Sequence, residues 1–109
     1  MYTINAMYQP DSKQIVLERN GNLLRLRKSL FWDLQESQIH PERNKRLIME
    51  RVFTRGNMME FKDLRDAYTS DEIKETIVRI GSLDKKTMVF LSKAYQIPLT
   101  SFKCFTQTQ

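Results

Sequence analysis

The chain has 109 residues, a formal net charge of +5, and apolar and charged fractions of 40% and 28%, which predict one globular domain and exclude a disordered or low-complexity chain. Cys104 is the only cysteine, so an intrachain disulfide is excluded and a reducing, cytoplasmic location is expected. The first residues lack the basic and apolar runs of a secretory signal, and no stretch approaches the roughly 18 apolar residues of a membrane span, so we expect no membrane association.

The first predicted element is a β-hairpin around Asn20-Gly21. Asn-Gly is the preferred two-residue hairpin turn, because both positions take positive φ. Folding the chain about this turn pairs four apolar side chains on one face, Leu17 with Leu24 and Ile15 with Leu26. Val16 pairs with Arg25 on the other face. A helix through these residues would carry the glycine in its interior at a cost of about 1 kcal/mol, so the hairpin is favoured.

Apolar spacing predicts two helices in the middle of the chain. Pro41 suits a first helical position, and apolar residues then recur every three or four positions as far as Arg55, with Gly56 as the stop. These apolar residues are Leu47, Ile48, Val52 and Phe53. A second helix, from about Met59 to Tyr68, is predicted by one face that holds Phe61, Leu64, Arg65 and Tyr68.

Two further helices have start signals. Thr69-x-x-Glu72 is a capping box, and Gly81 is expected to end that helix in a left-handed conformation. Asp84 is the predicted N-cap of the next helix, which Pro98 ends. The apolar stripe of this last helix comprises Thr87, Phe90, Leu91, Ala94 and Tyr95. The tail from Leu99 to Phe105 is expected to dock as one turn.

Catalytic motifs are scarce. The single histidine, His40, directly precedes Pro41 and is interpreted as a residue of the helix boundary. Carboxylates cluster at the start of the third helix, where the positive end of the helix dipole explains them without chemistry. The sequence has no Gly-rich phosphate loop, Cys-x-x-Cys or His-Glu-x-x-His motif, so we expect no enzyme activity, no cofactor and no metal.

Basic residues are more frequent in the first half, where residues 1–55 hold ten basic and six acidic side chains. The candidate contacts for an acidic partner or a nucleic acid are Arg19, Arg25, Arg27 and Lys28 of the hairpin with Arg43, Lys45 and Arg46 of the first helix. An ordinary solvated face is the favoured interpretation of these seven. Trp32 is a candidate anchor for a protein partner. Burial in the core is the favoured interpretation of this tryptophan.

A set of short motifs resembles a family of short uncharacterised bacterial proteins, a domain of unknown function. The motifs are Leu30-Phe31-Trp32-Asp33, Arg51-Val52 with Arg55-Gly56, Asp63-Leu64 with Tyr68, Leu83-Asp84 with Thr87, Phe90-Leu91-Ser92, and Ile97 with Phe102 and Cys104. The resemblance covers roughly residues 30–105 and implies a compact helical unit without known catalytic residues. It also implies genes that lie beside nucleotidyltransferase-type toxins. This chain departs from the pattern in its long leader and in Phe105, where a tyrosine is more usual.

Together these features predict a mainly α fold, a compact four-helix bundle with an N-terminal β-hairpin. Residues 1–30 form an arm and the hairpin, which belong to the same domain as the helical residues 31–109. The expected function is a non-enzymatic bacterial protein-binding or regulatory module, with an antitoxin-like role as one form. The alternative is a nucleic-acid-binding regulator that uses the basic hairpin and the first helix.

Overall fold

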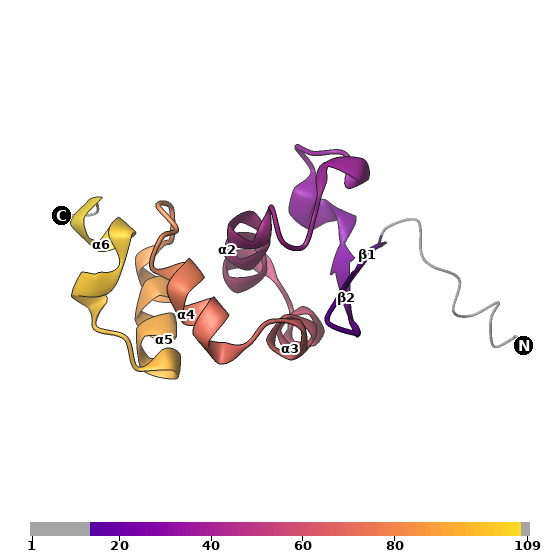
Figure 1. The fold of residues 1–109 in the computed structure, drawn as a ribbon. Coiled ribbons are helices and arrows are strands. Elements are labelled where there is room, and N and C mark those ends of the chain that lie inside the picture. The colour runs from indigo at the N-terminus through magenta and orange to yellow at the C-terminus, as the bar shows by residue number, and fades with distance from the viewer. Residues whose placement is uncertain (1–13, 108–109) are drawn as a thin grey trace, which may run out of the picture.

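The computed structural model of the protein describes residues 14–107, so the arm expected at residues 1–12 lies outside the described part. The elements in chain order are β1 (Gln14–Arg19), β2 (Asn22–Arg27), η1 (Lys28–Phe31), η2 (Glu36–Gln38), α2 (Lys45–Arg55), α3 (Met58–Ala67), α4 (Ser70–Ile77), α5 (Lys85–Tyr95), η3 (Leu99–Ser101) and α6 (Lys103–Gln107). The hairpin and α6 lie at opposite ends of this arrangement (Figure 1). The predicted mainly α fold with four helices and an N-terminal hairpin is confirmed.

The hairpin has the predicted turn and register. Asn20 and Gly21 have φ values of 53° and 81°, as the two-residue turn requires. Leu17 pairs with Leu24, and the other predicted pairs, Ile15 with Leu26 and Val16 with Arg25, are also present. The apolar face turns inward, where Leu24 and Leu26 are fully buried. The turn chemistry therefore fixes which face of the hairpin meets the helices.

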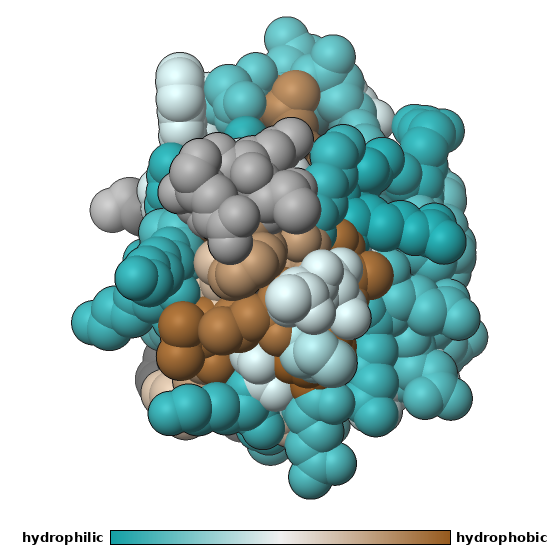
Figure 2. Space-filling model, turned by 90° about the vertical axis from the view of Figure 1, so that its left-hand side faces the viewer, coloured by the Kyte–Doolittle hydropathy of each residue, from teal (hydrophilic) through white to brown (hydrophobic). Residues whose placement is uncertain are grey.

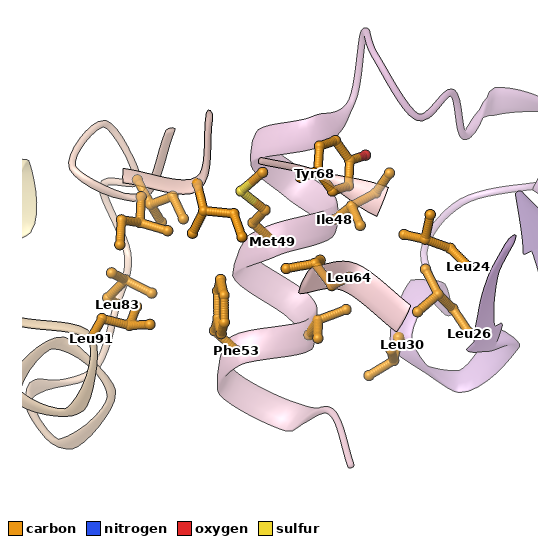
Figure 3. Close-up of a cluster of buried hydrophobic side chains, with 14 of the residues drawn as sticks. Leu24, Leu26, Leu30, Ile48, Met49, Phe53, Leu64, Tyr68, Leu83 and Leu91 are labelled. Atoms are coloured by element: carbon orange, nitrogen blue, oxygen red, sulfur yellow. The ribbon is translucent and has the colours of Figure 1, made fainter. Parts of the chain in front are cut away.

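Helix α2 stands at the centre of the core (Figure 3). Ile48, Met49 and Val52 have no exposed surface. Leu24, Leu26 and Leu30 lie on one side of this helix, and Leu83 and Leu91 of the α5 region lie on the other (Figure 3). One apolar helix thus joins the hairpin half of the core to the C-terminal half.

Side-chain caps start three of the four longer helices. Asn57 and Glu60 form a capping box at α3, Thr69 and Glu72 form the predicted one at α4, and the predicted N-cap Asp84 accepts from Thr87 at α5. The box at α3 was not predicted, although Asn57-x-x-Glu60 is readable in the sequence. Helix α2 begins at Lys45 instead of Pro41, because residues 41–44 form turns without continuous helical hydrogen bonds.

One predicted helix end, that of α4 at Gly81, is wrong. Helix α4 ends at Ile77, and Gly81 is absent from the residues with positive φ in the described range. Helix α5 ends at Tyr95, where Gln96 adopts the left-handed conformation with φ 56°, before Pro98 is reached. Glycine supplies a left-handed cap at no steric cost, yet here glutamine takes that conformation.

The C-terminal turn docks as predicted. Phe102 and Cys104 are each 1% exposed, and the Lys103 N–H donates to the Val78 carbonyl at 2.8 Å. Figure 2 faces this end of the molecule and shows hydrophobic residues gathered within a hydrophilic surround. Ile97, Leu99 and Phe105 are only partly buried at this end of the core.

Gly56 follows α2 for a reason of space. Its backbone is extended, with φ −78° and ψ 166°, so no left-handed conformation is needed. A Cβ at this position would lie 2.4 Å from the Val52 carbonyl oxygen, which accepts the Gly56 N–H at 2.8 Å. Only glycine allows the chain to leave α2 this closely and reach Asn57 two residues after the helix ends.

We expect Gly56→Ala to lower the free energy of unfolding by about 1–3 kcal/mol, because the new methyl group displaces the backbone at the end of α2. Urea titration followed by circular dichroism measures this change. Arg55→Ala, one residue away and exposed, is the control and should stay within about 0.5 kcal/mol of the wild type. Equal stability of the two variants would contradict the steric argument.

Candidate functional site

An aromatic cluster joins α2, α3 and α5 at the surface. Phe53 lies with its ring centroid 5.1 Å from that of Phe61 and 6.5 Å from that of Tyr95, both in edge contacts. Phe90 stacks on Phe61 at 5.9 Å with an interplanar angle of 14°. Such pairs stabilise the folded state beyond their burial alone. The cluster therefore holds α5 against α3 while leaving one ring, Phe90, 48% exposed.

A groove of about 380 Å³ opens beside this cluster. Its lining, called here the aromatic groove, is Phe53, Met58, Phe61, Arg65, Phe90, Ala94 and Tyr95. Met58 is 74% exposed, so the groove has a flexible apolar edge. Arg65 is its one charged lining residue, and burial raises the pKa of Tyr95 above its ordinary value. The groove is thus an apolar recess with a single cation.

The sequence builds this groove from two local features. The capping box at Asn57 starts α3 at Met58, which brings Met58, Phe61 and Arg65 onto one face at helical spacing. The predicted apolar stripe of α5 contains more residues than α5 buries against the core. Leu91 is fully buried, whereas Phe90 and Ala94 of the same stripe are exposed and line the groove.

A second hollow of about 400 Å³ continues from the groove. It shares Phe53, Phe61 and Phe90 with the aromatic groove and adds Thr54, Asp84, Lys86 and Thr87. The Asp84 carboxylate already accepts from the backbone and hydroxyl of Thr87. Lys86 has no ion-pair partner within residues 14–107. The apolar surface is therefore continuous across Phe90 and has cations at its edges.

Trp32 is 75% exposed, so its predicted burial in the core is wrong. Its neighbours Leu30 and Phe31 are 2% and 1% exposed and take the inward positions of the short turn η1. A single 3-10 turn leaves no third inward position for the next residue. Trp32 lines a separate hollow with Phe31 and Leu34, which is distinct in its residues from the aromatic groove.

Two of the predicted basic contacts, Arg25 and Arg27, are held by buried carboxylates of α3. Glu60, 2% exposed, accepts from the Arg27 backbone N–H and Nε at 2.9 Å each. Asp63, 5% exposed, accepts from the Arg25 backbone N–H and Nε at 3.1 Å each. The same two carboxylates thus cap the outer edge of β2 and neutralise its arginines. Burial alone would raise the pKa of Glu60, but the hydrogen bonds from Arg27 and Asn57 hold it below its ordinary value.

Arg19, another predicted contact, lies inside a contact network. Its guanidinium forms ion pairs with Glu42 and Glu72, donates to the Ala67 carbonyl at 2.9 Å, and lies 4.5 Å from the ring centroid of Tyr68. The side chain is 10% exposed. Hydrogen bonds from Arg19 and from the Thr69 backbone lower the pKa of Glu72 to about 2. Arg19 therefore joins the hairpin to the starts of α2 and α4.

The remaining predicted cations divide into two places. The Lys28 Nζ atom lies 3.9 Å from the Glu36 Oε1 atom in an exposed ion pair. Arg43, Lys45 and Arg46 surround a small hollow at the beginning of α2 and have no ion-pair partner within residues 14–107. Arg25 and Arg27 are thus held at α3, whereas Arg19 reaches Glu42, a residue of that small hollow. Sequence patterns do not reveal this arrangement, because the carboxylates that hold the hairpin arginines lie 23 to 53 residues away.

His40 lies at the turn that precedes α2. The Nδ1 atom of His40 accepts from the backbone N–H groups of Glu42 and Arg43 at 3.2 Å each, which agrees with its predicted place at a helix boundary. Across residues 14–107, no group of three or more His, Cys, Asp or Glu side chains is placed to hold a metal ion. In the same range, no helix has both the length and the apolar character to cross a membrane.

We expect Glu60→Gln to lower the free energy of unfolding by about 1–3 kcal/mol, because it removes the charge of a buried carboxylate and turns amide hydrogens toward Arg27, whose side chain is 42% exposed. Urea titration at pH 7 measures the loss. The control is Asp66→Asn on the same helix, whose exposed pair with Lys62 is worth at most about 0.5 kcal/mol. A loss no larger than that of the control would show that the Glu60 ion pair does not hold the hairpin.

We also expect the protein to lose stability in acid through Glu72. The pKa of this group falls from an ordinary 4.5 to about 2 on folding, so its contribution is complete above about pH 4.5 and is lost as the pH falls toward 2. Unfolding free energies at pH 7, 4 and 3 should therefore decline less steeply in Glu72→Gln than in the wild type. Glu75→Gln, exposed on the same helix, should keep the wild-type slope. A slope that Glu72→Gln leaves unchanged would rule out this origin of the acid sensitivity.

Comparison with known proteins gives one match. The sequence model of a family described as "Family of unknown function (DUF6922)" matches residues 26–77. This stretch runs from the end of β2 to the end of α4, so it includes the carboxylates of α3 and leaves out α5. No curated protein and no solved structure matches the chain. The family match supports an uncharacterised domain across a little under half of the chain, and to that extent it agrees with the resemblance found in the sequence.

Proposed function

We propose that this protein is a non-enzymatic protein-binding module whose recognition surface is the aromatic groove between α2, α3 and α5. The observation that carries the proposal is an exposed, stacked aromatic ring, Phe90, beside an apolar recess of about 380 Å³. Large exposed apolar side chains that gather around a recess are typical of protein interfaces. The groove lining includes no acid and no histidine, which favours binding over catalysis.

The partner segment is an amphipathic helix with apolar anchors and acidic flanks. An apolar groove between helices accepts such a segment through residues spaced three and four apart. Its acidic flank is argued from charge: Arg65 lines the groove, Lys86 lies beside Phe90 in the adjoining hollow, and neither has an ion-pair partner within residues 14–107. The net charge of +5 attracts the same kind of partner at longer range.

The two edges of the groove would contribute in different ways. Phe90 and Phe61 form a rigid stacked wall that loses little freedom when a partner binds. Met58, which is 74% exposed, supplies a flexible side chain that adapts to the partner's shape. Affinity would therefore depend most on the aromatic wall, as it does in interfaces with a few dominant residues.

The resemblance found in the sequence names one candidate partner, a nucleotidyltransferase-type toxin that this protein would restrain. Bacterial origin and the antitoxin-like role rest on that resemblance. The nucleic-acid alternative has less support at the hairpin, because carboxylates of the same chain neutralise the guanidinium groups of Arg19, Arg25 and Arg27. The protein-binding function is therefore the better supported of the two.

We expect Phe90→Ala to weaken partner binding at least tenfold, because it removes the exposed ring of the wall while leaving the buried core intact. The tagged wild type and variant are used to capture partners from the protein's own cells at moderate and high salt after nuclease treatment. Mass spectrometry identifies what is retained, and the affinity of the isolated partner and of its acidic helical segments is then measured by calorimetry.

Trp32→Ala is the control, because it removes a larger and more exposed aromatic side chain outside the groove. Circular dichroism verifies that both variants are folded. A partner that is retained by Trp32→Ala and lost by Phe90→Ala supports the aromatic groove. If only Trp32→Ala fails to retain the partner, the binding site lies at the turn η1 and not at the aromatic groove. Recovery of nucleic acid without protein would also overturn the proposal.

A further inference from the structure

The hollow at the beginning of α2 differs in chemistry from the aromatic groove. It has a volume of about 160 Å³ and lies between the start of α2 and the end of α4. Its lining, called here the basic hollow, is Glu42, Arg43, Lys45, Arg46, Thr76 and Arg79. The one acid of this set, Glu42, already pairs with Arg19. The four cations have no ion-pair partner within residues 14–107.

Thr76 gives this hollow a buried polar group without a partner. The residue is only 6% exposed, and its hydroxyl makes no hydrogen bond with the described part of the chain. By contrast, the Thr54 hydroxyl donates to the Glu50 carbonyl at 2.7 Å, the usual arrangement for threonine within a helix. Buried hydroxyl groups are almost always hydrogen-bonded, so an orphaned one beside four cations indicates a ligand with acceptor atoms.

The start of α2 also favours a bound anion. Its N-cap residue Asn44 makes no side-chain cap, because its Oδ1 atom accepts from the His40 N–H at 2.7 Å instead. The first turn of α2 contains no acid and begins with Lys45 and Arg46, although the N-terminal end of a helix favours negative charge. An anion in the basic hollow would balance both the helix end and its cations.

We propose that the basic hollow binds the dianionic phosphate group of a phosphate monoester or of inorganic phosphate. Three arginines can each present paired N–H groups to phosphate oxygens, and Thr76 can donate its hydroxyl. Water occupies about 30 Å³ per molecule in the liquid, so 160 Å³ holds one phosphate group and leaves the rest of the ligand in solvent. A monoester has three unsubstituted oxygens for this purpose, whereas the phosphodiester of a nucleic-acid backbone has two and carries one charge.

The test is a titration of the ¹⁵N-labelled full chain with inorganic phosphate, phenyl phosphate and dimethyl phosphate, followed by amide chemical shifts. Inorganic phosphate and phenyl phosphate should give saturable shifts in residues 43–46 and 76–79, and dimethyl phosphate should bind at least tenfold more weakly. Binding should also weaken between pH 7 and pH 5, because the second pKa of a phosphate monoester is about 6.

Two variants and one control distinguish specific phosphate binding in the basic hollow from non-specific attraction to a basic protein. Arg79→Ala and Thr76→Val should each weaken phosphate binding at least tenfold, whereas Arg65→Ala, which removes an equally unpaired cation at the aromatic groove, should not change it. Thr76→Val should fold with an equal or higher melting temperature, because it removes an unsatisfied hydroxyl group from the interior. Phosphate should raise the melting temperature of the wild type and of Arg65→Ala, and should raise it less in Arg79→Ala and Thr76→Val.

Two other outcomes overturn the proposal, and a third supports it for the free ion alone. Shifts that do not saturate, or that Arg65→Ala reduces as much as Arg79→Ala does, would show non-specific attraction to a basic protein. Tighter binding of a single-stranded oligonucleotide than of phenyl phosphate would identify a nucleic-acid surface instead. Inorganic phosphate that binds where phenyl phosphate does not would restrict the ligand to the free ion.

Discussion

The attachment of the hairpin to the helices depends on two buried carboxylates. Glu60 and Asp63 lie three residues apart on α3, and each accepts both the backbone N–H and the guanidinium of one arginine on β2. Glu60 and Asp63 are separated by a rise of about 4.5 Å along the helix, whereas their partners Arg27 and Arg25 are separated by about 6.8 Å along the strand. The longer side chain of glutamate can make up this difference. A two-stranded sheet is only marginally stable alone, so this edge contact and the apolar face must together hold it.

The same contact solves the problem of an open strand edge. Unpaired N–H groups on an edge strand attract other chains, and proteins cover such edges with helices or charges. Here Asp63 and Glu60 accept the outward N–H groups of Arg25 and Arg27, so α3 acts as a partner for β2. The arginines therefore have a structural role in this protein, which explains why a count of basic residues does not identify a binding surface.

Local signals in the sequence predict much of the fold. The Asn20-Gly21 turn fixes the strand register, and Thr69-x-x-Glu72 fixes the start of α4, because each is decided by residues next to one another. The left-handed end of α5 at Gln96 is not predictable in the same way, since glutamine does not favour this conformation, which is accompanied by hydrogen bonds from the backbone N–H groups of Gln96 and Ile97 to the Ser92 carbonyl.

The candidate sites were harder to predict, because they depend on residues far apart in the chain. The exposure of Trp32 follows from Phe31 occupying the inward position, and the exposure of Phe90 follows from a stripe on α5 that no neighbour fully covers. Both residues are large and apolar, so composition alone assigns them to the core. Likewise, spatial positions are needed to see that Asp63 of α3 pairs with Arg25, and that Arg43 and Arg46 have no ion-pair partner among the residues that the structure describes.

Helix α2 contributes to both proposed surfaces, since Lys45 and Arg46 at its start line the basic hollow and Phe53 near its end lines the aromatic groove. Eight residues of α-helix separate Lys45 from Phe53, a distance of about 12 Å along the axis. Ligands at the two sites can therefore be bound together without touching. The core residues between them, Ile48, Met49 and Val52, have no exposed surface, so a shift of α2 at one end must move the other end as well. The position of α2 is therefore the one feature through which a ligand at either site could affect the other.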